Sequence, residues 1–264
     1  MAKITLNSLA KMKQSGQKIT CLTAYDSTFA NLVSTQGIDV ILVGDSLGMV
    51  CQGQDSTVPV TMDDMCYHTR SVHKNINDAM LMADLPFASY TTDEQALQNA
   101  TRLMQSGAEI IKLEGEAWLA PVVTRLRQHG IPTCVHMGLT PQSVNVFGGY
   151  KVQGRDSDRA DAMIKAAIEL EAAGVAVLLL ECVPVALARE ITAAVSIPVI
   201  GIGAGPDTDG QILVVYDMLD LTPGRKPRFT KNFMSESGSA QEAVSSYVAA
   251  VRDGLFPARE HCFE

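Results

Sequence analysis

The sequence lacks several features that would place it at once in a special class of protein. It holds no run of 18 apolar residues; the nearest candidate, Gly174 to Ala188, spans 15 residues and contains Glu181, so we expect no membrane-spanning helix. None of its six cysteines has the C-x-x-C spacing of a zinc or redox site, and Cys134 and Cys182 lie in apolar runs. Buried thiols explain these cysteines better than disulfides, which predicts a cytoplasmic protein.

Positive charge is also scarce. The chain has 21 Lys and Arg against 29 Asp and Glu, a formal net charge of −8. A general nucleic-acid binder needs cations to neutralise phosphates, so this balance argues against one. Apolar residues are not scarce: they make up 47% of the chain, within the range of ordinary globular domains. The composition therefore predicts a folded protein rather than a disordered one.

The chain also lacks a linker. The length of 264 residues fits either two small domains or one α/β barrel of roughly 250 residues, and the absence of a Ser/Pro-rich stretch or run of charge favours the single barrel. A recurring pattern bears on this choice: a helix-like stretch ends at a Gly, a short apolar run follows, and the run ends in a polar residue. Gly suits a left-handed helix end, and uniformly apolar runs suit parallel strands buried on both faces.

Eight such strands are expected, near residues 18, 39, 79, 109, 132, 176, 198 and 212. Amphipathic helical stretches fill most of the gaps between them. Eight strands alternating with helices favour a (β/α)₈ TIM barrel over a doubly wound sheet. We therefore expect a single α/β barrel domain over residues 1–264, with a short helix near residues 6–12 before the first strand and a final helix over residues 239–254.

Two connections depart from the helical pattern. Residues 47–60 and 138–155 are long, polar and Gly-containing, and both follow strands at the end where barrel active sites lie. Irregular loops of this length are usually either functional or disordered. We interpret both as lids over the barrel mouth.

Polar side chains follow or end the expected strands, and in a barrel these strand ends meet at one mouth. The residues expected there are Asp45, Ser46, Asp84, Lys112, Glu114, His136 and Glu181. Carboxylates gathered in one place repel one another unless a cation neutralises them or some are protonated. Because oxygen ligands without a His/Cys cluster suit Mg²⁺, the pattern indicates a metal-assisted barrel enzyme without specifying its substrate.

Each of these residues has a simpler explanation when taken alone. An Asp after a strand is commonly a helix N-cap, a lone histidine is usually structural, and Lys112 is informative only if the strand register points it inward. Glu181 is harder to explain in this way, because it lies between Val-Leu-Leu-Leu and Cys-Val-Pro, where the weak solvation suits a general base. The segment Gly201–Gly205 fits either a tight turn or a phosphate cradle.

Several strings of the sequence resemble those of the ketopantoate hydroxymethyltransferase family. They are Thr23–Asp26, Val43–Met49, Ala83–Phe87, Val135–Ser143, Phe147–Gly154, Leu180–Pro184, and Gly201–Gly205 with Asp209–Gln211. The resemblance runs from about residue 3 to the C-terminus without large insertions. It departs from the family at Glu116, where a second Gly commonly follows Glu114-Gly115.

The resemblance implies both a fold and a reaction. The fold would be a barrel of the phosphoenolpyruvate mutase/isocitrate lyase type. The reaction would move a hydroxymethyl group from 5,10-methylenetetrahydrofolate to 3-methyl-2-oxobutanoate, giving 2-dehydropantoate for pantothenate biosynthesis through a Mg²⁺-stabilised enolate. A decamer built as a pentamer of dimers is also implied, and the final helix would pack on a neighbouring subunit.

The resemblance also assigns roles by position. The metal site would be formed by Asp45, Asp84 and Glu114. The substrate contacts would be Asp45, Ser46, Asp84 and Lys112. Glu181 would be the catalytic base, and His136 is a second candidate for orienting the substrate. Separately from the resemblance, the basic stretch Arg225–Lys231 lies after the eighth expected strand and fits either a solvated surface or a contact with the glutamate tail of the folate.

Two other functions stay open on the sequence. A superfamily relative acting on another 2-oxo acid, such as a lyase or a phosphonopyruvate-type mutase, would share the acidic mouth, although such enzymes typically carry a Cys-containing lid motif that this sequence does not show. A metal- or metabolite-binding scaffold would bind the same ligands without turnover.

Overall fold

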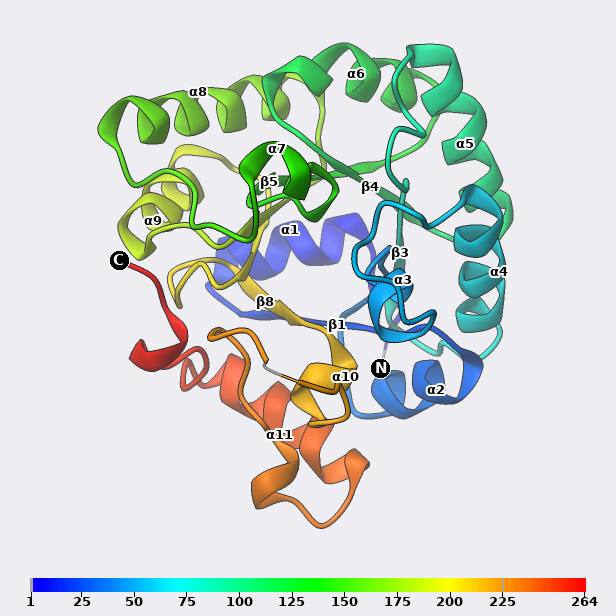
Figure 1. Cartoon of the computed structure of the whole chain (residues 1–264), viewed down its shortest axis with the longest axis vertical. Helices are drawn as coiled ribbons and strands as arrows, with labels where there is room; N and C mark the ends of the chain where they lie inside the picture. Colours follow the sequence, from blue (N-terminus) through cyan, green and yellow to red (C-terminus); the bar gives the residue numbers. More distant parts are fainter. Residues whose placement is uncertain (1, 225) are drawn as a thin grey trace.

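Eight parallel strands close into a barrel, and helices surround it (Figure 1). The strands are β1 (Ile19–Thr23), β2 (Val40–Val43), β3 (Met80–Asp84), β4 (Ile110–Glu114), β5 (Thr133–Gly138), β6 (Val177–Glu181), β7 (Val199–Ile202) and β8 (Gly210–Leu213). Each strand pairs with the next in chain order, and β8 pairs with β1. This computed structural model describes residues 2–224 and 226–264. It confirms all eight expected strands, although β8 begins two residues earlier than expected.

The strands are buried on both faces, which explains their uniformly apolar sequences. Every residue of β1 to β5 is buried. One face of each strand lines the barrel interior, and the other is covered by the outer helices. Polar residues within the strands are therefore exceptions that need partners, and the charged residues of β3 and β4 and the histidine of β5 lie toward the carboxyl ends of these strands.

The outer layer consists of helices that follow the strands. The longer ones are α2 (Ser27–Thr35), α4 (Met62–His73), α5 (Asp93–Gln105), α6 (Ala120–Gln128), α8 (Ser157–Ala173), α9 (Val185–Ala194) and α11 (Ala240–Arg252), with the short α10 (Val215–Met218) after β8. Several begin at side-chain caps: Asp26 accepts a hydrogen bond from the Phe29 amide, and Thr61 and Asp64 form a capping box. Within the described residues, no helix is long and apolar enough to cross a membrane.

Helix α1 (Leu6–Ser15) covers the amino-terminal ends of the strands. The Lys13 ammonium lies 2.9 Å from the carboxylate of Asp209, immediately before β8. The Ile4 amide donates to the Asp78 carbonyl oxygen, just before β3, at 2.8 Å. Leu9 is buried on the helix face that meets the barrel. With this end closed, a substrate must enter at the opposite, carboxyl-terminal end.

Helix α11 packs against the barrel of its own chain (Figure 1). Its Tyr247 hydroxyl lies 2.9 Å from the carbonyl oxygens of Cys21 and Gln211, on β1 and β8. Val244 and Val251 are also buried on this face. The apolar face of α11 and its tyrosine hydroxyl find their partners within the chain, and packing of this helix on a neighbouring subunit stays a prediction.

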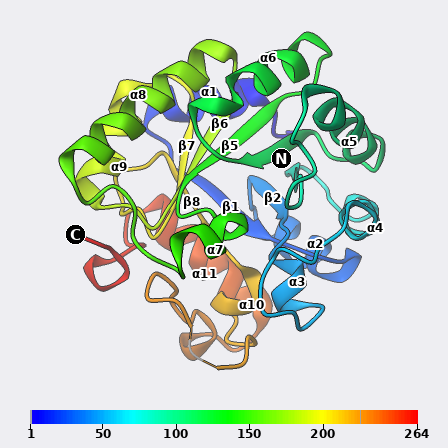
Figure 2. The same ribbon diagram turned by 45° about the horizontal axis from the view of Figure 1, so that its top comes forward.

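The two long connections lie over the carboxyl-terminal end of the barrel (Figures 1 and 2). Residues 47–60 begin with α3 (Leu47–Val50), and residues 138–155 contain the 3₁₀ turn Pro141–Ser143 followed by α7 (Val144–Phe147). The Tyr150 hydroxyl donates to the Met49 sulfur at 3.6 Å and so joins the two loops. Gly138 starts the second loop at φ +91°, where a Cβ would lie 2.4 Å from the carbonyl oxygen of Glu181.

Candidate active site

The structure brings the predicted site residues together at the barrel mouth. Asp84, Glu114 and Glu181 are the last residues of β3, β4 and β6, and Asp45 and Ser46 follow β2. The parallel register places Asp84 opposite Lys112 and Glu114 opposite His136. Residues predicted to converge because strand ends meet are thus neighbours through strand pairing.

Lys112 points into the acidic cluster, with its side chain only 5% exposed. Its ammonium nitrogen lies 2.7 Å from Asp84 Oδ1 and 3.6 Å from Glu114 Oε1. Burial lowers the pKa of Lys112, but the neighbouring carboxylates outweigh that effect and raise the pKa above its ordinary value. The side chain is therefore a fixed cation. The strand register, which the sequence left open, points Lys112 into the barrel.

His136 lies between two carboxylates. Its Nδ1 is 3.3 Å from Glu114 Oε1, and its Nε2 is 3.4 Å from Glu181 Oε2. Burial lowers the pKa of the imidazole, but the close carboxylates of Glu114 and Glu181 outweigh this and raise the pKa to about 9. His136 is therefore protonated at neutral pH and lies between Glu114 in the interior and Glu181, which is partly exposed.

The carboxylates differ in their surroundings. Burial raises the pKa of Asp45 well above its usual range, and the charges of Asp84 and Glu114 raise it further. Burial likewise raises the pKa of Asp84, although Lys112 opposes the shift. For Glu114 the opposing effects of Lys112 and His136 outweigh burial, and its pKa is lowered. The cluster thus contains more carboxylates than its two cations, Lys112 and His136, can neutralise.

Two residues that the sequence did not single out also belong to this mouth. The Gln142 side-chain amide donates to Asp45 Oδ2 at 2.8 Å, and its backbone amide donates to Glu114 Oε2 at 2.9 Å. The Tyr25 hydroxyl lies 2.8 Å from Ser46 Oγ. Both residues lie within the sequence strings that resemble the family, and this resemblance was the signal that could have found them. Neither residue is at a strand end, so the strand-end argument did not include them.

The sequence profile of the ketopantoate hydroxymethyltransferase family matches residues 3–259. The chain belongs to this family. A 3-methyl-2-oxobutanoate hydroxymethyltransferase of Shewanella loihica is 57% identical over 263 residues, which cover 100% of each chain. One from Marinobacter nauticus is 58% identical over 99% of each chain. The family predicted from the sequence is confirmed, and so is the hydroxymethyltransferase activity, whose name implies a step toward pantothenate.

Solved structures support the predicted fold. A phosphonopyruvate hydrolase in complex with oxalate and Mg²⁺ matches 98% of this chain and 99% of its own, with a TM-score of 0.62 and 13% identity. A 2,3-dimethylmalate lyase of the PEP mutase/isocitrate lyase superfamily matches 79% of this chain and 80% of its own, with a TM-score of 0.57 and 14% identity. At these identities the likeness concerns the fold alone.

The donor set at the mouth of this hydroxymethyltransferase suits a hard divalent cation. Asp45, Asp84 and Glu114 offer only oxygen ligands, which Mg²⁺ prefers. Asp84 Oδ1 is buried without a hydrogen bond, although Lys112 pairs with it electrostatically. Among the described residues no group of three His, Cys, Asp or Glu side chains is arranged to hold a metal ion; Lys112 pairs with Asp84, and the Gln142 side chain donates to Asp45. The acids fit Mg²⁺ by their chemistry and their excess negative charge.

The segment Gly201–Gly205 is a packed turn. Gly203 has φ +60°, and a Cβ at this position would lie 3.0 Å from both Phe229 and Phe263. Gly205 is similarly close to Val185. Side chains already cover these glycines, so of the two explanations left open by the sequence the structure favours the turn over a phosphate cradle.

The basic stretch near the C-terminal part of the chain is engaged in local pairs. Lys226 forms an ion pair with Asp220, and the Lys231 ammonium lies 3.6 Å from Glu236. Arg225 lies outside the described residues. The described lysines are thus balanced by nearby acids.

Glu116, where the sequence departs from the family, forms a contact between outer elements. Both carboxylate oxygens of Glu116 accept hydrogen bonds from the guanidinium of Arg159 on α8, one of them at 2.8 Å. A bidentate pair of this kind fixes the loop after β4 to the outer layer. The substitution therefore concerns the loop and not the acidic mouth.

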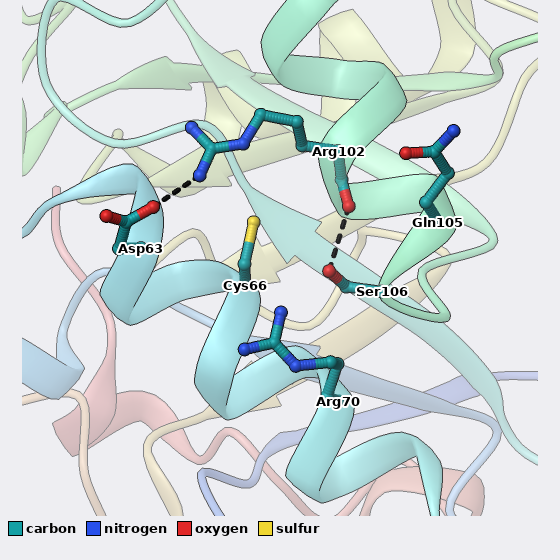
Figure 3. A pocket seen from close by; sticks show the side chains of 6 residues that line it. All are labelled: Asp63, Cys66, Arg70, Arg102, Gln105 and Ser106. Atoms are coloured by element: carbon teal, nitrogen blue, oxygen red, sulfur yellow. Dashed lines mark hydrogen bonds and ion pairs between the residues drawn. The ribbon is translucent and has the colours of Figure 1, made fainter.

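A surface cleft of about 340 Å³ lies between α4 and α5 on the outer layer (Figure 3). Figure 3 shows Arg102 reaching across it to Asp63, and Ser106 Oγ donates to the Arg102 carbonyl oxygen at 2.8 Å. Both ion-pair partners are exposed to solvent. This cleft contains none of the site residues, so the chemistry belongs to the barrel mouth.

Proposed function

We propose that this hydroxymethyltransferase joins the one-carbon unit of 5,10-methylenetetrahydrofolate to C3 of 3-methyl-2-oxobutanoate, giving 2-dehydropantoate. The observation that carries the proposal is the contrast in burial at the mouth. Glu181 keeps 14% of its side chain exposed, whereas the side chains of Asp84 and Glu114 are 2% exposed and lie beneath it. The inner acids suit a binding role, and the rim acid suits proton transfer with a substrate that enters from solvent.

The inner acids Asp45, Asp84 and Glu114 would hold Mg²⁺. When bound, the ion would supply Lewis-acid stabilisation of the negative charge that develops on the oxo oxygen. Support comes from the excess of buried carboxylates and from the raised pKa values of Asp45 and Asp84, which show how unfavourable these anions are without further positive charge.

Lys112 and Ser46 would contact the substrate carboxylate, together with Asp45 and Asp84 around the metal. An anionic oxo acid must enter a mouth lined with acids, and Lys112 supplies a permanent cation there. Fixing the carboxylate turns C3 toward the base, and orientation of this kind lowers the entropic part of the barrier.

Glu181 would remove the proton from C3. The electron pair of the broken C–H bond forms the new bond to the folate methylene carbon, and the two C–N bonds of that carbon break. Water supplies the hydroxyl group, and the C3 proton and the second proton of water end on the two folate nitrogens, so that tetrahydrofolate leaves. His136 Nε2, 3.4 Å from Glu181 Oε2, would orient the base.

We propose further that the chain forms one domain and assembles as a decamer, a pentamer of dimers, as its resemblance to the family implies. A cytoplasmic location is supported by the cysteines. All six are free in the described part of the chain, and five of them are buried. Thiols of this kind suit a reducing compartment.

Removal of the divalent ion should abolish turnover. In a complete assay with 5,10-methylenetetrahydrofolate, 3-methyl-2-oxobutanoate and Mg²⁺, we expect EDTA to lower the rate at least about 100-fold, since metal stabilisation is worth several kcal/mol. EDTA already saturated with Mg²⁺ is the control and should leave the rate unchanged. Full activity under EDTA would contradict the metal assignment, and turnover of another oxo acid without folate would favour a lyase or mutase instead.

Loss of the Tyr25 hydroxyl should weaken substrate binding. Tyr25→Phe removes the partner 2.8 Å from Ser46 Oγ, so that Ser46 is no longer held in one orientation. We expect the KM for the oxo acid to rise about threefold to tenfold, the equivalent of one hydrogen bond, with kcat nearly unchanged. Tyr247→Phe removes an equally buried hydroxyl from α11 and should leave KM unchanged. Equal KM values in both variants would remove Tyr25 from this role.

A further inference from the structure

Gln142 is a buried polar residue in a loop that also has strongly exposed positions. It belongs to the 3₁₀ turn Pro141–Ser143 within the connection after β5. Val146 and Tyr150 of the same connection are 86% and 54% exposed, whereas Gln142 is 5% exposed. Its side chain is thus directed from the loop into the mouth, where a neutral amide is held among charged groups.

Every polar group of the Gln142 side chain is hydrogen-bonded. Its Nε2 donates to Asp45 Oδ2 at 2.8 Å and to the Leu85 carbonyl oxygen at 2.9 Å. Its Oε1 accepts from the Tyr90 hydroxyl at 2.6 Å. This arrangement uses both N–H groups and the carbonyl oxygen, which leaves no buried polar atom of the amide unpaired.

The surroundings also fix which way the amide points. If the amide were flipped, its oxygen would face the Asp45 carboxylate and the Leu85 carbonyl, both of which only accept hydrogen bonds. Tyr90, which donates to Oε1, is itself held at the end of β4 by backbone contacts with Glu114. Gln142 can therefore act at Asp45 in one way only, as a donor.

Gln142 contacts two acids that come from different strands. The side-chain amide holds Asp45, which follows β2, and the backbone amide holds Glu114 Oε2 at the end of β4. Unlike Lys112, Gln142 is neutral, so it orients these carboxylates without neutralising the charge that attracts a cation. Moving the loop away from the mouth would remove both donors at once.

We propose that Gln142 is a positioning residue that sets Asp45 and Glu114 for a divalent cation. This proposal rests on the function proposed above, in which those acids hold the metal. Groups that orient metal ligands in this way typically change metal affinity by about 10- to 100-fold when they are removed. The expected signature is thus a change in the affinity for the metal alone, before any substrate is present.

The experiment measures Mn²⁺ binding to the whole enzyme by calorimetry, without oxo acid or folate. We expect Gln142→Leu to weaken Mn²⁺ binding about 10- to 100-fold. Gln153→Leu is the matched control, because Gln153 lies in the same loop and its side chain donates only to the Lys151 carbonyl oxygen; it should bind as the wild type does. Asp45→Asn and Glu114→Gln test the metal site itself.

The outcomes separate the two proposals. If Asp45→Asn and Glu114→Gln bind Mn²⁺ as the wild type does, the metal site proposed above fails. If these variants lose affinity but Gln142→Leu stays within twofold of the wild type, the role of Gln142 is overturned. Should Gln142→Leu fail to fold by circular dichroism, Tyr90→Phe decides: it removes the hydroxyl that orients the amide, weaker Mn²⁺ binding supports the role, and unchanged binding overturns it.

Discussion

Glu181→Gln is expected to lower kcat for hydroxymethyl transfer by about 100- to 10,000-fold, the range typical of a lost general base. The amide keeps the size of the side chain at the end of β6 but cannot accept the C3 proton. The same variant should nearly stop exchange of the C3 proton of 3-methyl-2-oxobutanoate with solvent. Proton NMR in D₂O with Mg²⁺ present, and without folate, measures this exchange separately from the transfer step.

The exchange measurement needs two controls. Glu190→Gln changes an exposed acid on α9 and should exchange at the wild-type rate. Mn²⁺ binding by Glu181→Gln should also match the wild type, because Glu181 contacts His136 and is not among the proposed metal ligands. Exchange at the wild-type rate in Glu181→Gln would remove Glu181 from the role of base, whereas lost Mn²⁺ binding would show that the variant disturbs the whole mouth.

The barrel could be predicted from the sequence because its signals are local and repeated. Each strand is a short apolar run that is buried on both faces, and the helices before β1, β2, β4, β5 and β6 are followed within two residues by a Gly. The strand-end acids followed from the same pattern, since Asp84, Glu114 and Glu181 occupy equivalent places on β3, β4 and β6. Parallel pairing then brings these equivalent positions together, and this does not depend on the conformation of the loops.

Contacts between distant segments could not be predicted in this way. Gln142 and Asp45 are 97 positions apart, and Tyr25 and Ser46 are 21 apart in different loops. Neither pair follows a helix or strand period, so no periodicity argument finds it. The contacts of α11 are of the same kind: its apolar stripe was visible in the sequence, but the partners of Tyr247 on β1 and β8 were not. Hydrogen-bond geometry at the mouth thus required the structure.

Lys112→Met should destabilise the fold by about 3–5 kcal/mol at pH 8, the usual effect of removing one partner from a buried ion pair. Methionine fills a similar volume but leaves Asp84, 2.7 Å from the lost ammonium, and Glu114 without their shared cation. Urea unfolding followed by circular dichroism measures the change. Lys165→Met, on an exposed position of α8, is the control and should alter stability by less than about 0.5 kcal/mol.

The pH dependence of this loss identifies its cause. In the wild type, burial raises the pKa of Asp84, and Lys112 opposes that rise, so removing the lysine moves the folded-state pKa further above the unfolded one. A carboxyl group whose folded pKa is the higher one destabilises the fold when ionised, and this effect is relieved as the pH falls through the folded pKa. The deficit of Lys112→Met should therefore be smaller at pH 5 than at pH 8. A deficit that is the same at both values would mean that lost packing, and not unpaired buried charge, destabilises the variant.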